Sequence, residues 1–343
     1  MIRFGPAGIP LSSKGRTLRD AVEDVNKFGL NALEVQFVRT HIIERYAHEE
    51  EIGYSMFEVP GTMIVDVIRE EDGEKKILSV RKKIEKGDMV RVLASKLARD
   101  YMELREIGEI AKELDVELSV HAPYYIVLSE SKDRELVRRS IDGIRWAGLV
   151  GHVLDARVVV THGGLYGKRG KEKGVQNIIK NLREIKSWFR RNRLSPMLGI
   201  ETSGKQELFG TLDEVLDLSK KLNLFPVLNF AHIHAREGGS LRTAEDFEKL
   251  FERVNSVRKM DWYHTHFSGV EHEGGNEIRL TPLKKGDLKF ESLASYLASH
   301  NPQITIICSS PLLEHDAIYM KVMYERAVAH LIAKRKKHEK KSK

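Results

Sequence analysis

Cysteine is almost absent from this sequence: of 343 residues, only Cys308 is a cysteine. A single thiol can form no internal disulfide and no cysteine-rich zinc cluster, so a bound metal would have to be held by histidine, aspartate and glutamate. Glutamine is also scarce, with four residues in a chain that is 31% charged. A bias towards lysine and glutamate over thermolabile amides is typical of thermophile proteins, and we expect a thermophilic source.

Long hydrophobic runs are missing as well. No apolar run approaches the roughly 18 residues that a membrane-spanning helix needs. The opening MIRFGPAGIP is too short for a signal peptide and lacks its charged start. We therefore expect a cytoplasmic protein without a membrane partner.

The net charge of +7 is concentrated at the C-terminus. Residues 334–343, KRKKHEKKSK, hold seven lysines or arginines and one glutamate, a local charge of +6, which leaves +1 for residues 1–333. Such a run is typical of a solvated, disordered tail, and the alternative is an electrostatic arm for DNA, RNA or a ribonucleoprotein. We predict a folded domain over residues 1–333 and a disordered basic tail over 334–343.

Short apolar runs rich in β-branched residues alternate with longer segments of helical periodicity. The eight predicted strands cover residues 2–5, 32–38, 117–124, 156–164, 197–204, 226–234, 261–269 and 303–311. Thr211 and Thr243 stand where helix N-caps belong. Apolar strands separated by helices require a parallel sheet covered by helices. Eight such repeats favour an α/β fold of the closed (β/α)8 TIM barrel type over an open doubly wound sheet.

Residues 53–95 interrupt this alternation after the second predicted strand. Turn signals occur at Pro60-Gly61, Asp72-Gly73 and Gly87-Asp88. We predict a small β-hairpin-rich insertion on the face of the barrel where the strands end. It would act as a lid or as a packing element.

Polar side chains stand at the ends of the predicted strands. The carboxyl ends of barrel strands meet at one mouth, so residues far apart in the sequence come together there. These residues are His121, His162, Glu201, Asn229 with His232, His266, and Ser309. A lone histidine at a strand end is more often structural than a ligand. Three imidazoles and a carboxylate at one mouth, without a Ser–His–Asp order or phosphate-binding glycines, predict a metal centre of the zinc type.

Six phrases of the sequence carry a family resemblance. LSVHAPYY, VVTHGG, GIETSGK, LNFAHIHAREGG, HTHFSGVE and SPLLEHDA, in this order and spacing, make the chain similar to the endonuclease IV family of abasic-site endonucleases, within the xylose-isomerase-like barrels. The opening FGPAGIP also resembles the archaeal branch, and the match covers about residues 1–40 and 100–330. The resemblance implies a trinuclear zinc cluster that hydrolyses the phosphodiester on the 5′ side of an abasic site.

The resemblance also implies metal ligands by position. His121 and His162 match the histidines of the first metal, and Glu201 matches the carboxylate that bridges the first and second metals; Glu201 is also the predicted catalytic residue. His266 matches a ligand of the second metal, and His232 matches one of the third. His234, two residues further, is predicted to lie on the same side and to orient a neighbouring ligand.

Several expected ligands are replaced in this chain. Asn229 stands where the family has an aspartate, and Ser309 stands where it has a glutamate. Leu280 replaces a histidine and Ile278 a carboxylate, although a shifted alignment lets Glu277 or Glu273 supply one acid. Carboxylates offset the repulsion between neighbouring cations, and this chain has fewer of them than the family pattern. We therefore expect one zinc or manganese ion, held by two histidines and a glutamate, and at most three ions.

Basic and aromatic side chains near the predicted mouth are candidates for nucleic-acid binding. They are Tyr124, Lys168, Arg169, Lys205 and Arg236. Three functions stay open: a metal-dependent phosphodiesterase on abasic or damaged nucleic acid with a reduced metal centre, a non-catalytic nucleic-acid or ribonucleoprotein-binding protein, and a single-metal sugar isomerase or epimerase.

Overall fold

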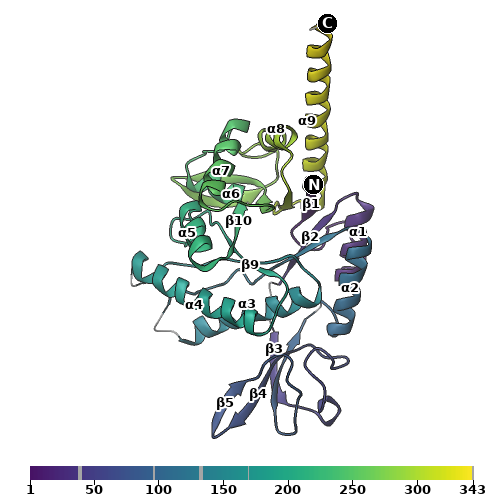
Figure 1. Cartoon of the computed structure of the whole chain (residues 1–343), viewed down its shortest axis with the longest axis vertical. Coiled ribbons are helices and arrows are strands. Elements are labelled where there is room, and N and C mark those ends of the chain that lie inside the picture. The colour runs from purple at the N-terminus through teal and green to yellow at the C-terminus, as the bar shows by residue number, and fades with distance from the viewer. Residues whose placement is uncertain (38–40, 96, 131–133, 169, 342–343) are drawn as a thin grey trace.

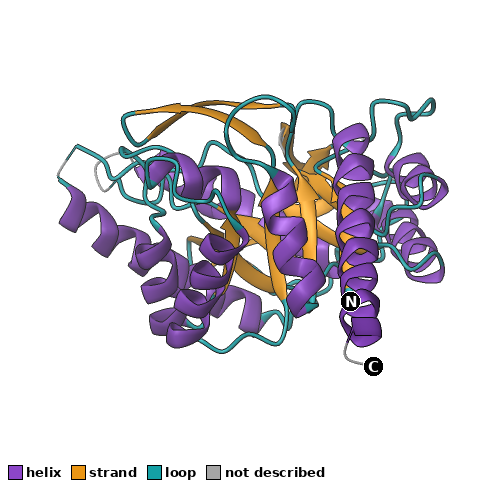
Figure 2. Ribbon diagram, turned by 90° about the horizontal axis from the view of Figure 1, so that it is seen from above, coloured by secondary structure: helices purple, strands orange, loops and turns teal. Residues whose placement is uncertain are grey.

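The structure is a computed structural model that describes residues 1–343 apart from 38–40, 96, 131–133, 169 and 342–343. Arg169, a predicted nucleic-acid contact, thus lies outside the described residues. Helices surround a central group of strands (Figure 2). Within the described ranges, no helix combines the length and the apolar character needed to cross a membrane.

Eight parallel strands form the barrel, which confirms the predicted fold. They are β1 (Ile2–Pro6), β2 (Ala32–Gln36), β7 (Glu117–His121), β8 (Val158–Thr161), β9 (Met197–Glu201), β10 (Phe225–Asn229), β11 (Tyr263–Phe267) and β14 (Ile304–Cys308). Their order is β1-β14-β11-β10-β9-β8-β7-β2, and a parallel bridge between Ala7 and Glu34 joins the two ends of this order. Both faces of most strands are buried, as a sheet enclosed by helices requires.

Nine helices are present among the described residues. They are α1 (Leu18–Lys27), α2 (Tyr101–Glu113), α3 (Arg134–Val153), α4 (Lys171–Arg191), α5 (Leu212–Leu222), α6 (Phe230–Arg236), α7 (Ala244–Val257), α8 (Phe290–His300) and α9 (Glu314–Lys341). Thr211 and Thr243 cap α5 and α7 as predicted, each accepting a hydrogen bond from a backbone amide three residues on. A hairpin of β12 (Gly269–Glu273) and β13 (Asn276–Thr281) follows β11.

The insertion is a four-stranded antiparallel sheet that begins at His41, not at residue 53. Its strands are β3 (His41–Tyr46), β4 (Ile64–Glu71), β5 (Glu74–Ile77) and β6 (Met89–Ala94), in the order β3-β6-β4-β5, with a short 3-10 helix η1 (Glu49–Glu51). β3 pairs with β6 across more than forty residues, a partner that turn signals alone could not reveal.

Side chains of this sheet bind the outer helices of the barrel. Asp66 of β4 accepts hydrogen bonds from Arg145 at 3.1 Å and from Trp146 at 3.0 Å, both on α3. Tyr101 of α2 donates to the carbonyl of Ile64 at 3.1 Å. These contacts hold the sheet against α2 and α3, and they are those of a packing element.

The C-terminal segment is helical, so the prediction of a disordered tail is wrong through Lys341. Lysine and arginine are good helix formers and their charge is favourable at a helix C-terminus, so α9 continues through them. At its start, Glu314 accepts from the backbone amide of Leu11, which follows β1. Lys321 donates to the carbonyl of Gly29, before β2. The basic end of α9 therefore projects from the barrel end opposite the mouth, and Figure 1 shows it far from the inserted sheet.

Candidate metal centre at the barrel mouth

The strand β10 ends at Asn229, and α6 begins at once with Phe230. The prediction that the strand continues to residue 234 is therefore wrong. Asn229 is the N-cap of α6, and its Oδ1 accepts hydrogen bonds from the backbone amides of Ala231 at 3.1 Å and His232 at 3.2 Å. Residues two apart on a helix point to nearly opposite sides, so His232 and His234 diverge.

Glu201, at the end of β9, is the centre of the site. Its side chain is buried, and its Oε2 lies 3.0 Å from Nε2 of His121 and 3.4 Å from Nε2 of His162. Each of these three residues offers a ligand atom within 4.8 Å of the other two. The structure thus brings together the three predicted ligands of the first metal.

Hydrogen bonding fixes which nitrogen of His121 carries the hydrogen. Its Nδ1 lies 2.7 Å from the carbonyl oxygen of Ala122, which can only accept, so Nδ1 is the donor. In the neutral ring, Nε2 then directs a lone pair at the Glu201 carboxylate. Two electron-rich atoms at 3.0 Å require a positive charge between them or beside them, either a proton or a metal cation. The donor set of two histidines and a glutamate fits a zinc-type cation.

The other carboxylate oxygen of Glu201 has different neighbours. Since Oδ1 of Asn229 accepts from two backbone amides, its Nδ2 must be the atom that faces Glu201, and it donates to Oε1 at 2.9 Å. Nδ1 of His266 also lies 3.2 Å from Oε1. The Oε2 side therefore faces Nε2 of His121 and of His162, whereas Oε1 already accepts a hydrogen bond from Asn229.

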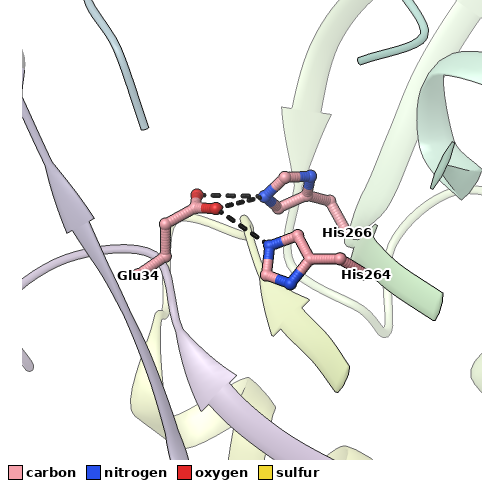
Figure 3. Close-up of side chains that lie close together, drawn as sticks. All are labelled: Glu34, His264 and His266. Carbon is pink, nitrogen blue, oxygen red and sulfur yellow. Dashed lines mark hydrogen bonds and ion pairs between the residues drawn. The ribbon is translucent and has the colours of Figure 1, made fainter. Parts of the chain in front are cut away.

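Glu34 of β2 belongs to the same cluster, although it is not among the predicted site residues. It is 1% exposed, and both its oxygens lie 2.9 Å from Nε2 of His266. His264 approaches Glu34 as well, with its Nε2 at 3.2 Å, so that the two histidines of β11 meet the carboxylate of β2 (Figure 3). An ionisable residue inside the apolar run ALEVQFV was the available signal.

His232 pairs with a carboxylate that the sequence only suggested. Its Nδ1 faces the carbonyl oxygen of Thr202 at 2.7 Å, so Nε2 is free to meet Oε2 of Glu277 at 3.1 Å. Glu277 is on β13, one residue before the exposed Ile278. Leu280 packs on the hydrophobic core opposite Val270.

Among the described residues, Ser309 makes a hydrogen bond through its backbone only. Its amide donates to the carbonyl of Phe267 at 3.1 Å. Its hydroxyl is buried and has no hydrogen-bond partner within the part of the chain that the structure describes. A serine therefore leaves a polar atom but no charge where a family member would place a carboxylate.

The electrostatics of the site favour positive charge. Burial, with neighbouring histidines, lowers the pKa of His162 to about 4, so that ring is neutral at neutral pH. Burial also acts to lower the pKa of His121, but its hydrogen bond to Glu201 and the charge of Glu34 outweigh it and raise that pKa. The pKa of Glu201 is held well below its ordinary value because the charge of His266, with the side-chain contacts of His121 and His266, overcomes the effect of burial.

A cavity of about 420 Å³ opens beside the cluster. Its polar side includes His162, His232 and Glu277, and its other walls are largely apolar. The lining residues are Tyr124, Tyr125, Ile126, Val127, His162, Gly164, Leu165, Ser203, Gly204, Lys205, Glu207, Leu208, Phe209, His232 and Glu277. No residue of the inserted sheet is in this set, so among the described residues that sheet does not line the cavity.

Two predicted nucleic-acid contacts, Tyr124 and Lys205, line the cavity, whereas Arg236 is used otherwise. The Tyr124 ring lies 4.7 Å from that of His121, between centroids. The Arg236 guanidinium donates to the carbonyls of Ser203 at 3.2 Å and Leu208 at 2.8 Å, and also to that of Lys205. It therefore holds the loop of residues 203–208 in place and is not free to bind a phosphate. Lys168 is exposed outside the cavity.

His234 does not orient a ligand of this site, contrary to the prediction. It is fully buried, and its Nδ1 accepts a hydrogen bond from the backbone amide of Leu241 at 3.0 Å. Its Nε2 must then carry the hydrogen, and it donates to Asp287 at 3.1 Å. His272 also bonds Asp287, at 3.2 Å. Because Nε2 of His234 is a donor, this second His–Asp–His group is a hydrogen-bonded brace between α6 and the hairpin.

The similar proteins include an uncharacterized archaeal protein and proteins named as endonucleases. An uncharacterized protein of Methanocaldococcus jannaschii is 29% identical over 330 residues, which are 94% of this chain and 97% of that protein. A protein named probable endonuclease 4, from Staphylococcus carnosus, is 23% identical over 220 residues, which are 62% of this chain and 72% of that protein.

Solved structures of similar shape include an endonuclease and an epimerase. Endonuclease IV from Thermus thermophilus has a TM-score of 0.60 and 16% identity, covering 96% of this chain and 99% of that chain. L-ribulose 3-epimerase has a TM-score of 0.58 and 11% identity, covering 98% and 97%. At these identities the likeness shows the fold alone. The family model described as a xylose isomerase-like TIM barrel matches residues 46–320, and the chain belongs to that family.

Proposed function

We propose that this chain is a metal-dependent phosphodiesterase that acts on abasic or otherwise damaged DNA through one divalent cation. One observation carries the proposal: Nε2 of His121 and Nε2 of His162 both face Oε2 of Glu201, at 3.0 Å and 3.4 Å, while Oε1 of the same carboxylate accepts a hydrogen bond from Asn229. Because Oε1 already accepts a hydrogen bond, only Oε2 is left to bind a cation, and this arrangement suits a single ion. The relatives named endonuclease 4 supply the reaction class.

The residues that would hold the cation are His121, His162 and Glu201. When bound, a zinc or manganese ion supplies a Lewis acid that polarises a phosphoryl oxygen and lowers the pKa of a water. The chain's own contribution is to fix the ligands in advance. His121 is oriented by the carbonyl of Ala122, and Glu201 is oriented by Asn229.

The cavity supports a substrate with an apolar part and an anionic part. Tyr124, Leu165 and Leu208 offer apolar surface that a flipped-out sugar or base can cover, and unstacked nucleotides bind such surfaces. Lys205 and His232 lie on the same cavity and offer positive charge to a phosphate. The hydrogen bond and charge of Glu277 overcome the effect of burial and raise the pKa of His232, which keeps a proton available on its Nε2.

The test is cleavage of a duplex with one abasic site, compared with an undamaged duplex of the same sequence. Protein purified without chelator is analysed for metal and assayed before and after chelation. Glu201→Gln removes the ligand charge, and Glu273→Gln removes an exposed carboxylate of β12 as the matched control. We expect cleavage by the wild type and by Glu273→Gln only. Cleavage by Glu201→Gln at the wild-type rate would contradict the proposal.

A sugar epimerase is the second candidate, favoured by the two carboxylates beside His232. Glu277 lies 3.1 Å and Glu201 lies 3.7 Å from that ring. Moving a proton at a sugar carbon needs an acid and a base, and a cavity of about 420 Å³ is large enough for a monosaccharide. Incubation of the same preparation with a panel of ketoses in heavy water decides between the candidates, because epimerisation incorporates deuterium at carbon and phosphodiester hydrolysis does not.

A further inference from the structure

We infer that Glu34 is a positioning residue: through His266 it holds Oε1 of Glu201, and so presents Oε2 to a single cation. The inference rests on the proposed single-cation site. Glu34 comes from β2 and His266 from β11, which are not neighbours in the barrel, so their contact crosses the barrel interior (Figure 3).

Glu34 is held in place from several sides. His264 lies 3.2 Å from Oε2, Gln36 donates to Oε1 at 3.0 Å, and Ser119 donates to Oε2 at 3.3 Å. A carboxylate with this many donors is fixed in orientation and stays ionised. It is therefore a rigid acceptor for the remaining partner, His266.

His266 connects Glu34 to the candidate metal centre. Its Nε2 is 2.9 Å from both oxygens of Glu34, and its Nδ1 makes an ion-pair contact with Oε1 of Glu201 at 3.2 Å that is not aligned as a hydrogen bond. The ring therefore cannot rotate without losing the contacts at Glu34. Together with the amide of Asn229 at 2.9 Å, it occupies the Oε1 side of Glu201.

A metal ion between Glu34, His264 and His266 is the alternative, because their ligand atoms lie within 4.8 Å of one another. Binding through Nε2 of both rings would place the hydrogen of each ring on Nδ1. Nδ1 of His264 is buried and has no hydrogen-bond partner among the described residues. A buried N–H without an acceptor is costly. Hydrogen bonds from Nε2 to Glu34 avoid this cost, so we assign the group a positioning role.

The isosteric variant Glu34→Gln tests the inference. A glutamine has one acceptor oxygen and no charge, so it cannot receive both histidines and cannot form the ion pair that fixes His266. The matched control is His264→Gln, which also disturbs the buried group but leaves the contact between Glu34 and His266. Replacement of a group that orients a metal ligand typically weakens metal binding by about 10- to 100-fold.

The measurement is a titration of chelator-treated full-length protein with Co²⁺, followed by its visible absorption, with circular dichroism to verify folding. We expect Glu34→Gln to bind Co²⁺ at least about tenfold more weakly, with an altered spectrum, and His264→Gln to stay within about threefold of the wild type. Equal losses in both variants, or wild-type affinity in folded Glu34→Gln, would overturn the inference.

Two further outcomes are decisive. If Glu34→Gln does not fold, Glu34→Asp keeps the charge but retracts the carboxylate from His266, and wild-type affinity and spectrum in that variant would overturn the inference. If the wild type binds no Co²⁺, the proposed function fails and the inference fails with it. Wild-type binding that Glu34→Gln leaves unchanged removes only the inference.

Discussion

The substitution Asn229→Asp reverses the hydrogen-bonding character of the Oε1 side. An aspartate keeps the shape of asparagine, and one of its oxygens can still accept from the backbone amides that cap α6. Its other oxygen replaces the amide nitrogen that donates to Glu201 at 2.9 Å. A donor is thus exchanged for a negative charge beside a buried carboxylate.

The magnitude follows from the distance. Two unit charges at 2.9 Å repel by about 6 kcal/mol at an effective dielectric constant of about 20. Protonating the new aspartate at pH 7, from its usual pKa of about 3.9, costs about 4 kcal/mol. Protonation is therefore the cheaper outcome, and it restores a donor to Glu201. We expect Asn229→Asp to lose about 4 kcal/mol of unfolding free energy at pH 7 without metal.

The stability deficit of Asn229→Asp should become smaller as the pH falls. The folded-state pKa of the new acid is raised above its unfolded value, so the folded state gains stability relative to the wild type as the pH falls. The deficit should shrink by about 1.4 kcal/mol for each pH unit between about pH 8 and pH 4. Urea unfolding in chelator at a series of pH values measures it.

A divalent cation should reverse the deficit and bind in greater number. At about 1,000 times its dissociation constant a ligand adds about 4.1 kcal/mol of stability, and the second carboxylate opens the Oε1 side to a further cation. The matched control is Asn181→Asp. The side-chain amide of Asn181 lies away from the site and donates to the carbonyl of Leu128 at 2.8 Å. This variant should lose stability without recovery by metal. An Asn229→Asp variant that is as stable as the wild type in chelator, or that still binds one ion, would refute the reasoning.

Two other substitutions and one deletion test parts of the structure. Arg145→Ala removes a cation that pairs with two buried carboxylates, Asp66 and Asp142, and should cost about 3–5 kcal/mol in urea unfolding, while Co²⁺ affinity of the folded protein stays unchanged; a loss of affinity would tie the inserted sheet to the site. Arg236→Met should release the loop that carries Lys205, lowering stability by about 3 kcal/mol and raising KM with little change in metal affinity; an unchanged KM would show that the loop does not bind substrate. Deletion of residues 334–343 should leave kcat/KM on a short abasic duplex within about twofold, because α9 projects from the opposite end of the barrel; a larger loss would place the basic helix at the substrate.

The barrel could be predicted because its signals are local and repeated. Eight apolar runs at the spacing of strand and helix leave few architectures, and capping residues such as Thr211 and Thr243 mark where helices begin. The meeting of His121, His162 and Glu201 follows from the topology alone, since every parallel strand ends at the same mouth.

The remaining features depend on contacts between distant segments. Glu34 reads as one acid in an apolar strand, and only the closed barrel shows that β2 faces β11 across the interior. The helix after Asn229 is seven residues long, too short for a periodic signal, and it decides that His232 enters the site and His234 does not. The pairing of β3 with β6 is equally non-local.

The charges around the cavity bear on the choice between an anionic and a neutral substrate. The charge of Glu34 is met by His264 and His266, so Glu201 and Glu277 are the acids left to offset a cation. One dication cancels these two charges. On the cavity wall the charge of Glu207 offsets that of Lys205, and the raised pKa of His232 favours a positive charge on that ring. A neutral sugar gains little from this charge, whereas a phosphodiester brings the single negative charge that it favours. Under the proposed function, Asn229 is therefore expected to reduce the number of cations while leaving the cavity suited to an anionic substrate such as DNA.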